Sequence, residues 1–190
     1  MKNNYAFTLV KLVLFLIIFC FFTELTLSFW HQIKTQIGFN INILIFSVVA
    51  FFSFSEFIAN LNGFYKKVQS FFFRSSQLMI LFPALLIISG IGYFLLPKIL
   101  NTSFNKDIFT FLGGFILTSH LCFIAKEIKG HTFSTFINYM FVFSILYILN
   151  LIFLGVYLKV AFNIQIGKII IEGARNGTSL IQYIFAQVFS

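Results

Sequence analysis

The sequence contains very little charge. Asp, Glu, Lys and Arg make up 9% of its 190 residues, whereas 59% are apolar and the mean hydropathy is +0.98. Soluble globular domains contain about 25% charged residues, so an ordinary soluble domain is excluded. The chain is instead expected to fold as an all-α integral membrane protein, with the lipid bilayer as its first partner.

The sequence is also poor in residues that build catalytic or metal centres. Its two cysteines, Cys20 and Cys122, both fall within apolar runs, where neither a disulfide nor a metal pair is expected. It contains no CxxC or HExxH motif, and no phosphate-binding loop or nucleophile–base set can be assembled from it. The sequence therefore predicts a non-enzymatic protein with no catalytic residues, no metal site and no cofactor.

The net charge of +8 comes from lysines scattered near the ends of apolar runs, without a basic cluster of the nucleic-acid type. Attraction to anionic lipid headgroups explains this charge, so no nucleic-acid partner is expected. The amino-acid composition favours residues with AT-rich codons: it includes 28 Ile, 12 Asn and 11 Lys, but only 8 Ala and 2 Arg. This bias indicates an AT-rich genome, and hence a bacterial inner membrane or a mitochondrial inner membrane.

Long apolar runs separated by short polar segments predict about five transmembrane helices, because a helix needs about 20 residues to cross the hydrocarbon core. The predicted spans cover residues 7–29, 41–61, 77–96, 108–125 and 136–160. They are expected to form one bundle over residues 1–163. Pro83 is expected to kink the third span, and Pro97 with the polar segment 101–107 is expected to turn the chain back after it. Two glycine pairs, Gly90 with Gly92 and Gly113 with Gly114, offer points where other helices approach closely.

The tail, residues 164–190, contains two apolar segments that are each too short to cross a membrane. Gln165, Lys168 and Glu172 fall on one side of a helix, which predicts an amphipathic segment over 164–172 lying in the interface. Gly173 and Gly177 are expected to loosen this helix, so that the chain turns and a second short helix follows. Glu172 and Arg175 are expected to pair at the turn, and a tightly bent sixth span is the alternative.

The segment Phe64–Arg74 mixes aromatic and basic residues, as expected of an interfacial anchor. A binding surface for a partner is the alternative. Basic residues are also unevenly divided between the two expected sides of the membrane. Seven lie on the side of the N-terminus and three on the other: Lys2, Lys11, Lys66, Lys67, Arg74, Lys126 and Lys129 against Lys34, Lys98 and Lys106. This excess places the N-terminus in the cytoplasm or the matrix, although basic residues of the tail reduce it.

Four polar residues in or near the spans are candidates for an ion pathway: Glu56, Asn60, His120 and Asn150. Glu56 and Asn60 share one helical stripe with Ser53. This stripe is either a stepping stone for a proton or cation, or a set of interhelical hydrogen bonds near the interface, which its position favours. Asn150 is expected to bond neighbouring helices together. His120 either titrates near neutral pH or caps a carbonyl.

A polar cluster between the fourth and fifth spans forms a candidate interface: Lys126, Glu127, Lys129 and His131. The surrounding segment, SHLCFIAKEIKGHTF at 119–133, resembles a pattern of bacterial Yip-type membrane proteins. The matching positions are His120, Leu121, Ala125, Lys126, Gly130, Thr132 and Phe133. The stretch 173–186 is similar to the closing segment of that family. The resemblance covers about a fifth of the chain, and it implies a five-span, non-enzymatic accessory protein that acts through partners.

Two classes of function stay open. The first is an accessory or structural subunit of a larger membrane complex of respiratory, ATP-synthase or export type, with other transmembrane subunits as partners. It is motivated by the near absence of soluble loops, the small-residue faces and the lack of a reactive constellation. The second is a small transporter or ion-conducting subunit, which would use the four candidate polar residues of the spans.

Overall fold

The computed structural model describes residues 3–57, 61–101, 104–128 and 133–189, and these residues form an all-helical architecture. The helices are α1 (Asn3–Lys34), α2 (Ile41–Phe57), α3 (Leu61–Phe72), α4 (Ser76–Leu81), α5 (Ala84–Leu100), α6 (Lys106–Glu127), α7 (Phe133–Lys159) and α8 (Ile166–Phe189). The all-α class expected from the composition is therefore confirmed, and apolar helices of this length indicate integration into a membrane.

Within the described residues, three helices are long and apolar enough to cross a membrane: α1 from Phe7, α6 and α7. A fourth candidate is the pair α2 and α3. Taken together as one span, the two helices are long and apolar enough, but the chain bends by 108° at the break between them. The helix α5 is apolar but has only 17 residues. The structure thus supports three to four spans, fewer than the five or so that the sequence predicts.

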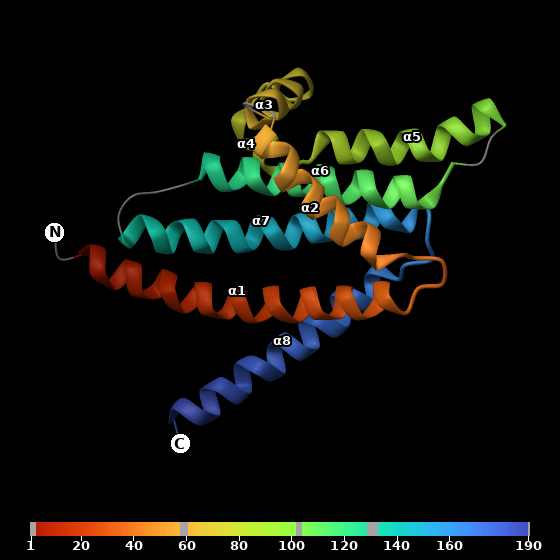
Figure 1. The fold of residues 1–190 in the computed structure, drawn as a ribbon. Coiled ribbons are helices and arrows are strands. Elements are labelled where there is room, and N and C mark those ends of the chain that lie inside the picture. The colour runs from red at the N-terminus through yellow and green to blue at the C-terminus, as the bar shows by residue number, and fades with distance from the viewer. Residues whose placement is uncertain (1–2, 58–60, 102–103, 129–132, 190) are drawn as a thin grey trace.

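The helices form a layered bundle (Figure 1). The helices α6 and α7 lie side by side and antiparallel, α1 runs along the other side of α7, and α8 lies beyond α1. The helices α2 and α5 pack on α6. Tyr157 of α7 holds the centre of the bundle, because it stacks on Phe109 at 3.9 Å between ring centroids and donates a hydrogen bond to the Phe109 carbonyl at 2.9 Å. Gly90 and Gly113 make room for this ring, as their small size predicts.

The third predicted span is broken at Pro83. The helix α4 ends at Leu81, Phe82 is extended with φ −118° and ψ 122°, and α5 begins at Ala84. Pro83 has no N–H, so the helical hydrogen bond at this point is lost and the kink expected from the sequence becomes a break. Pro97 takes no part in the predicted turn, because α5 continues through Pro97 to Leu100. The helix ends at Asn101, the start of the predicted polar turn segment, whose left-handed φ of 50° redirects the chain.

The tail forms one continuous helix, so the turn predicted at Gly173 and Gly177 is wrong. Both glycines are buried against α1, where a Cβ added at Gly173 would lie 2.9 Å from the Cα of Leu25 and one at Gly177 would lie 2.7 Å from Cδ1 of Phe21. Packing that only glycine permits outweighs its low helix propensity. The predicted ion pair between Glu172 and Arg175 is also wrong. Glu172 forms its ion pair with Lys168, one turn earlier in α8, at 3.8 Å.

Substitution of Gly173 by alanine is expected to weaken the packing of α8 on α1. The new methyl group meets backbone that cannot rotate away, and such overpacking costs about 1–3 kcal/mol. Gly167 is the matched control, because a Cβ there meets nothing within 4 Å. Unfolding of the two alanine variants in detergent micelles measures the difference. Equal stability of Gly173→Ala and Gly167→Ala would contradict the packing described here.

Candidate functional site

The candidate site is a buried polar cluster that joins α3, α6 and the break between α4 and α5. Its members are Tyr65 and Gln69 of α3 and His120 of α6, which are 4%, 0% and 0% exposed. Tyr65 Oη lies 3.0 Å from His120 Nδ1, and Gln69 Nε2 lies 2.9 Å from Tyr65 Oη and 3.2 Å from His120 Nδ1. Apolar side chains enclose the cluster, among them Met79 and Phe123.

The directions of these hydrogen bonds follow from the chemistry of each group. Gln69 Nε2 also donates to the Phe82 carbonyl at 3.2 Å, and since a carbonyl only accepts, the NH₂ group must face this corner. The NH₂ group carries two hydrogens, and the second lies nearest Tyr65 Oη, so the phenol hydrogen of Tyr65 points to His120 Nδ1, which accepts it. Tyr65 therefore accepts from Gln69 and donates to His120, which places the proton of a neutral ring on Nε2.

This cluster forms hydrogen bonds that connect the break between α4 and α5 to α3 and α6. Phe82 lies between α4 and α5, where the regular helical hydrogen bonds stop, and its carbonyl is taken up by Gln69. Irregular backbone at membrane depth is tolerated only where protein groups or water satisfy it. The aligned Tyr65 and Gln69, four residues apart on one face of α3, therefore fix both α3 and the broken span on α6.

Two atoms of the cluster lack a hydrogen bond of good geometry. Gln69 Oε1 and His120 Nε2 are buried and have no hydrogen-bond partner among the described residues. The carbonyl of Ile80 interacts with the His120 ring but does not form a hydrogen bond that satisfies Nε2. The described part of the chain contains no group of His, Cys, Asp and Glu that could hold a metal ion.

The structure separates the four candidates for an ion pathway. His120 belongs to the buried cluster, whereas Glu56 is exposed on α2, as is Ser53 of the same stripe. Asn150 is fully buried in α7, where its Nδ2 donates to the Leu146 carbonyl at 2.8 Å. Asn60 lies outside the described residues. No hydrogen bond or ion pair joins Glu56 to His120 or Asn150 within the described ranges.

Of the candidate interface at the end of α6, the structure places two residues. Glu127 forms an ion pair with Lys66 of α3 at 2.7 Å, and Lys126 is exposed. Lys129 and His131 lie outside the described residues. The ion pair fastens α3 to α6 on the same side as the buried cluster. The segment Phe64–Arg74 thus has an inward, packed side as well as the exposed aromatic and basic residues noticed in the sequence.

Sequence reasoning missed Tyr65 and Gln69, because their segment looked like a lipid anchor. The available signal was their spacing of four residues, which places two hydrogen-bonding side chains on one helical face. It also missed Lys11, whose Nζ donates to Oδ1 of Asn138 at 2.8 Å and so joins α1 to α7. Both contacts bring together residues that are far apart in the sequence, so composition and local spacing could not show them.

An apolar groove opens on the side of the bundle between α1, α2, α6 and α7. Its volume is about 470 Å³, and its walls include Trp30, Val48, Leu117, Cys122 and Tyr147. A second apolar crevice of about 280 Å³ separates the far ends of α1 and α8, between Leu16 and Ile184. Both hollows are lined almost wholly by apolar side chains, which suits lipid chains or apolar helix faces.

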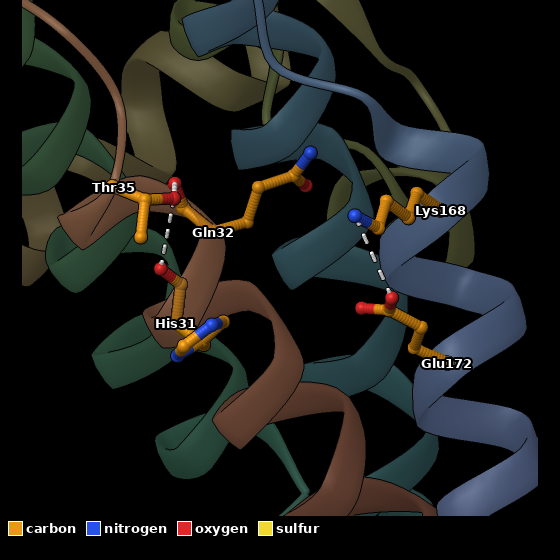
Figure 2. A network of polar contacts seen from close by, with 5 residues as sticks. All are labelled: His31, Gln32, Thr35, Lys168 and Glu172. Carbon is orange, nitrogen blue, oxygen red and sulfur yellow. Dashed lines mark hydrogen bonds and ion pairs between the residues drawn. The ribbon is translucent and has the colours of Figure 1, made fainter.

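The outer side of α8 presents a line of polar residues, the polar stripe: Lys168, Glu172, Arg175, Ser179 and Gln182. They are spaced three or four residues apart and so lie on one side of the helix, away from the glycines that contact α1. Figure 2 shows the first turns of this stripe, with Lys168 and Glu172 reaching toward each other beside the end of α1. There the side-chain NH₂ group of Gln32 donates to the Gln165 carbonyl at 3.2 Å, and the side-chain oxygen of Gln32 accepts from the Gln165 N–H at 3.1 Å.

Comparison of the chain with family models, with curated proteins and with solved structures finds no match in any of the three. The resemblance to Yip-type proteins therefore stays a prediction from residues 119–133 and 173–186.

Substitution of Tyr65 by phenylalanine is expected to cost about 1–2 kcal/mol of stability, because it removes the buried hydroxyl that accepts from Gln69 and donates to His120. Tyr183→Phe is the matched control, since that hydroxyl is exposed and accepts from Gln187 at 2.7 Å. Unfolding in detergent is the measurement, and combining Tyr65→Phe with His120→Leu gives their coupling energy. An additive double variant would show that the two side chains do not act together.

Proposed function

We propose that this chain is a non-enzymatic accessory or structural subunit of a larger membrane protein complex. The observation that carries the proposal is the position of α8, which lies along a candidate span and turns a polar stripe outward. A side of a membrane helix that is polar and that no described part of the chain covers suits contact with another membrane protein better than contact with lipid.

The direction and register of α8 follow from its contacts with α1. Three facing pairs define them: Gln32 with Gln165, Leu25 with Gly173, and Phe21 with Gly177. Residue numbers on α1 fall as those on α8 rise, so the two helices are antiparallel, as Figure 1 also shows. The helix α1 is long and apolar enough to span, whereas α8 is not among the helices that meet this condition on their own. In this proposal α8 nevertheless crosses the membrane beside α1, as one continuous helix and not as the tightly bent span that the sequence left as an alternative.

Lipid is a poor neighbour for the polar stripe. A Lys, Arg or Asp at the centre of a transmembrane helix costs about 2.5–3.5 kcal/mol in insertion measurements, and pairing or hydrogen bonding offsets that cost. A second membrane subunit packed on this side of α8 would supply such partners. The assembly is of respiratory, ATP-synthase or export type, in a bacterial or mitochondrial inner membrane, and the accessory role agrees with the resemblance to Yip-type proteins.

Purification from native membranes in mild detergent is expected to yield a complex larger than the chain's own 21.9 kDa. The same partners should be recovered when the tag is placed at either end of the chain, and a tag carried by an unrelated span should recover none of them. A monodisperse species of the chain's own size, with no partner in stoichiometric amount, would argue decisively against the proposed function.

A further inference from the structure

Arg175 is the charged residue of the polar stripe that has no counter-charge. Lys168 and Glu172 pair with each other at 3.8 Å, which leaves one unbalanced cation on this side of α8. The Arg175 side chain is exposed, and its guanidinium makes no hydrogen bond or ion pair with any residue that the structure describes. Glu24 of α1 lies at a similar level, but no ion pair joins it to Arg175.

If α8 crosses the membrane beside α1, as proposed above, its contacts with α1 set the depth of Arg175. It lies between Gly173, which faces Leu25, and Gly177, which faces Phe21. The span Phe7–Lys34 has 28 residues, so its middle falls between residues 20 and 21. At 1.5 Å per residue, the level of Arg175 is within about 7 Å of that middle. The hydrocarbon core extends about 15 Å to either side, so the Arg175 backbone is well inside it.

From this placement we propose that α8 docks a transmembrane helix of another protein, and that a carboxylate on this helix pairs with Arg175 near the middle of the membrane. This inference rests on the proposed function and names the chemistry of its partner. A guanidinium presents a planar fork that matches a carboxylate with two parallel hydrogen bonds. Ser179 and Gln182 continue the stripe beyond Arg175 and offer a hydroxyl and an amide to the same partner.

A second copy of the chain fits this site less well. Copies in one membrane share one orientation, because the distribution of basic residues sets it. Two α8 helices would then meet in parallel, with Arg175 facing Arg175 and Glu172 facing Glu172 across a two-fold axis. Like charges opposed in this way repel each other. A lipid phosphate is disfavoured by depth, since headgroups lie outside the hydrocarbon core.

The test uses the full-length chain in its native membranes, with a photo-crosslinking amino acid at Ser179, one turn from Arg175 on the polar side. We expect it to capture a segment of a different membrane protein that contains Asp or Glu within a span. The same probe at Ala174, which is exposed on the apolar side of α8, is the positional control and should not capture that segment.

Three charge variants then decide the role of Arg175. Arg175→Gln should lower the cross-linking yield from position 179 at least about tenfold, because one member of a desolvated charge pair is lost. Arg175→Lys keeps the charge and should retain most of the yield. Arg74→Gln alters the other arginine of the chain, which is exposed beyond α3, and should leave the yield unchanged. Arg175→Glu should be rescued when the partner's carboxylate is replaced by arginine.

The possible failures are distinguishable. If the complex is recovered but Arg175→Gln leaves the yield unchanged, or the captured segment has no carboxylate, the pairing is overturned while the proposed function stands. Capture of a second copy alone, or of lipid alone, overturns it as well. If Glu24→Gln lowers the yield as much as Arg175→Gln, the arginine pairs within the chain. Failure to recover any complex from native membranes overturns the proposed function itself.

Discussion

Close contact between α1 and α8 at two glycines is the interaction on which the outer half of this structure depends. Gly173 and Gly177 bring the backbone of α8 against Leu25 and Phe21, nearer than any side chain would allow. In lipid, where hydrophobic association between helices is weak, such backbone approach is a main source of helix packing. It fixes the direction of α8 and its level along α1, and hence which of its residues face outward.

The inner half depends on a different constraint, the need to satisfy backbone groups away from water. The break at Phe82 and Pro83 frees polar groups, and Gln69 takes up one of them. Tyr65 and His120 complete this network, while the ion pair of Lys66 and Glu127 supports it from the exposed side. One half of the fold is thus assembled by close packing of small residues and the other by hydrogen bonds around an interrupted helix.

This division explains what the sequence could predict. The helices α1, α6 and α7 follow from long apolar runs, because length and hydropathy alone decide whether such a segment spans. The break at Pro83 follows from local chemistry. The docking of α3 on α6 and the continuity of α8 do not, since each depends on contacts distant in sequence: Tyr65 with His120, and Gly173 with Leu25. For the candidate site, His120 could be selected as a polar residue in a span, but its partners on α3 could not.

The two faces of α8 also bear on how the chain enters the membrane. The ribosome makes α8 after α1 and α7, and a helix carrying Lys168, Glu172 and Arg175 gains little by moving into lipid alone. In the proposed assembly, its insertion is therefore coupled to docking on a span that is already in place. In the proposed assembly, a chain without its partner keeps charged groups facing lipid. Such groups lower the stability of the chain, and less stable chains are cleared by chaperones and proteases. In the proposed assembly, the amount of this protein in a cell would therefore follow the supply of the subunit that covers α8.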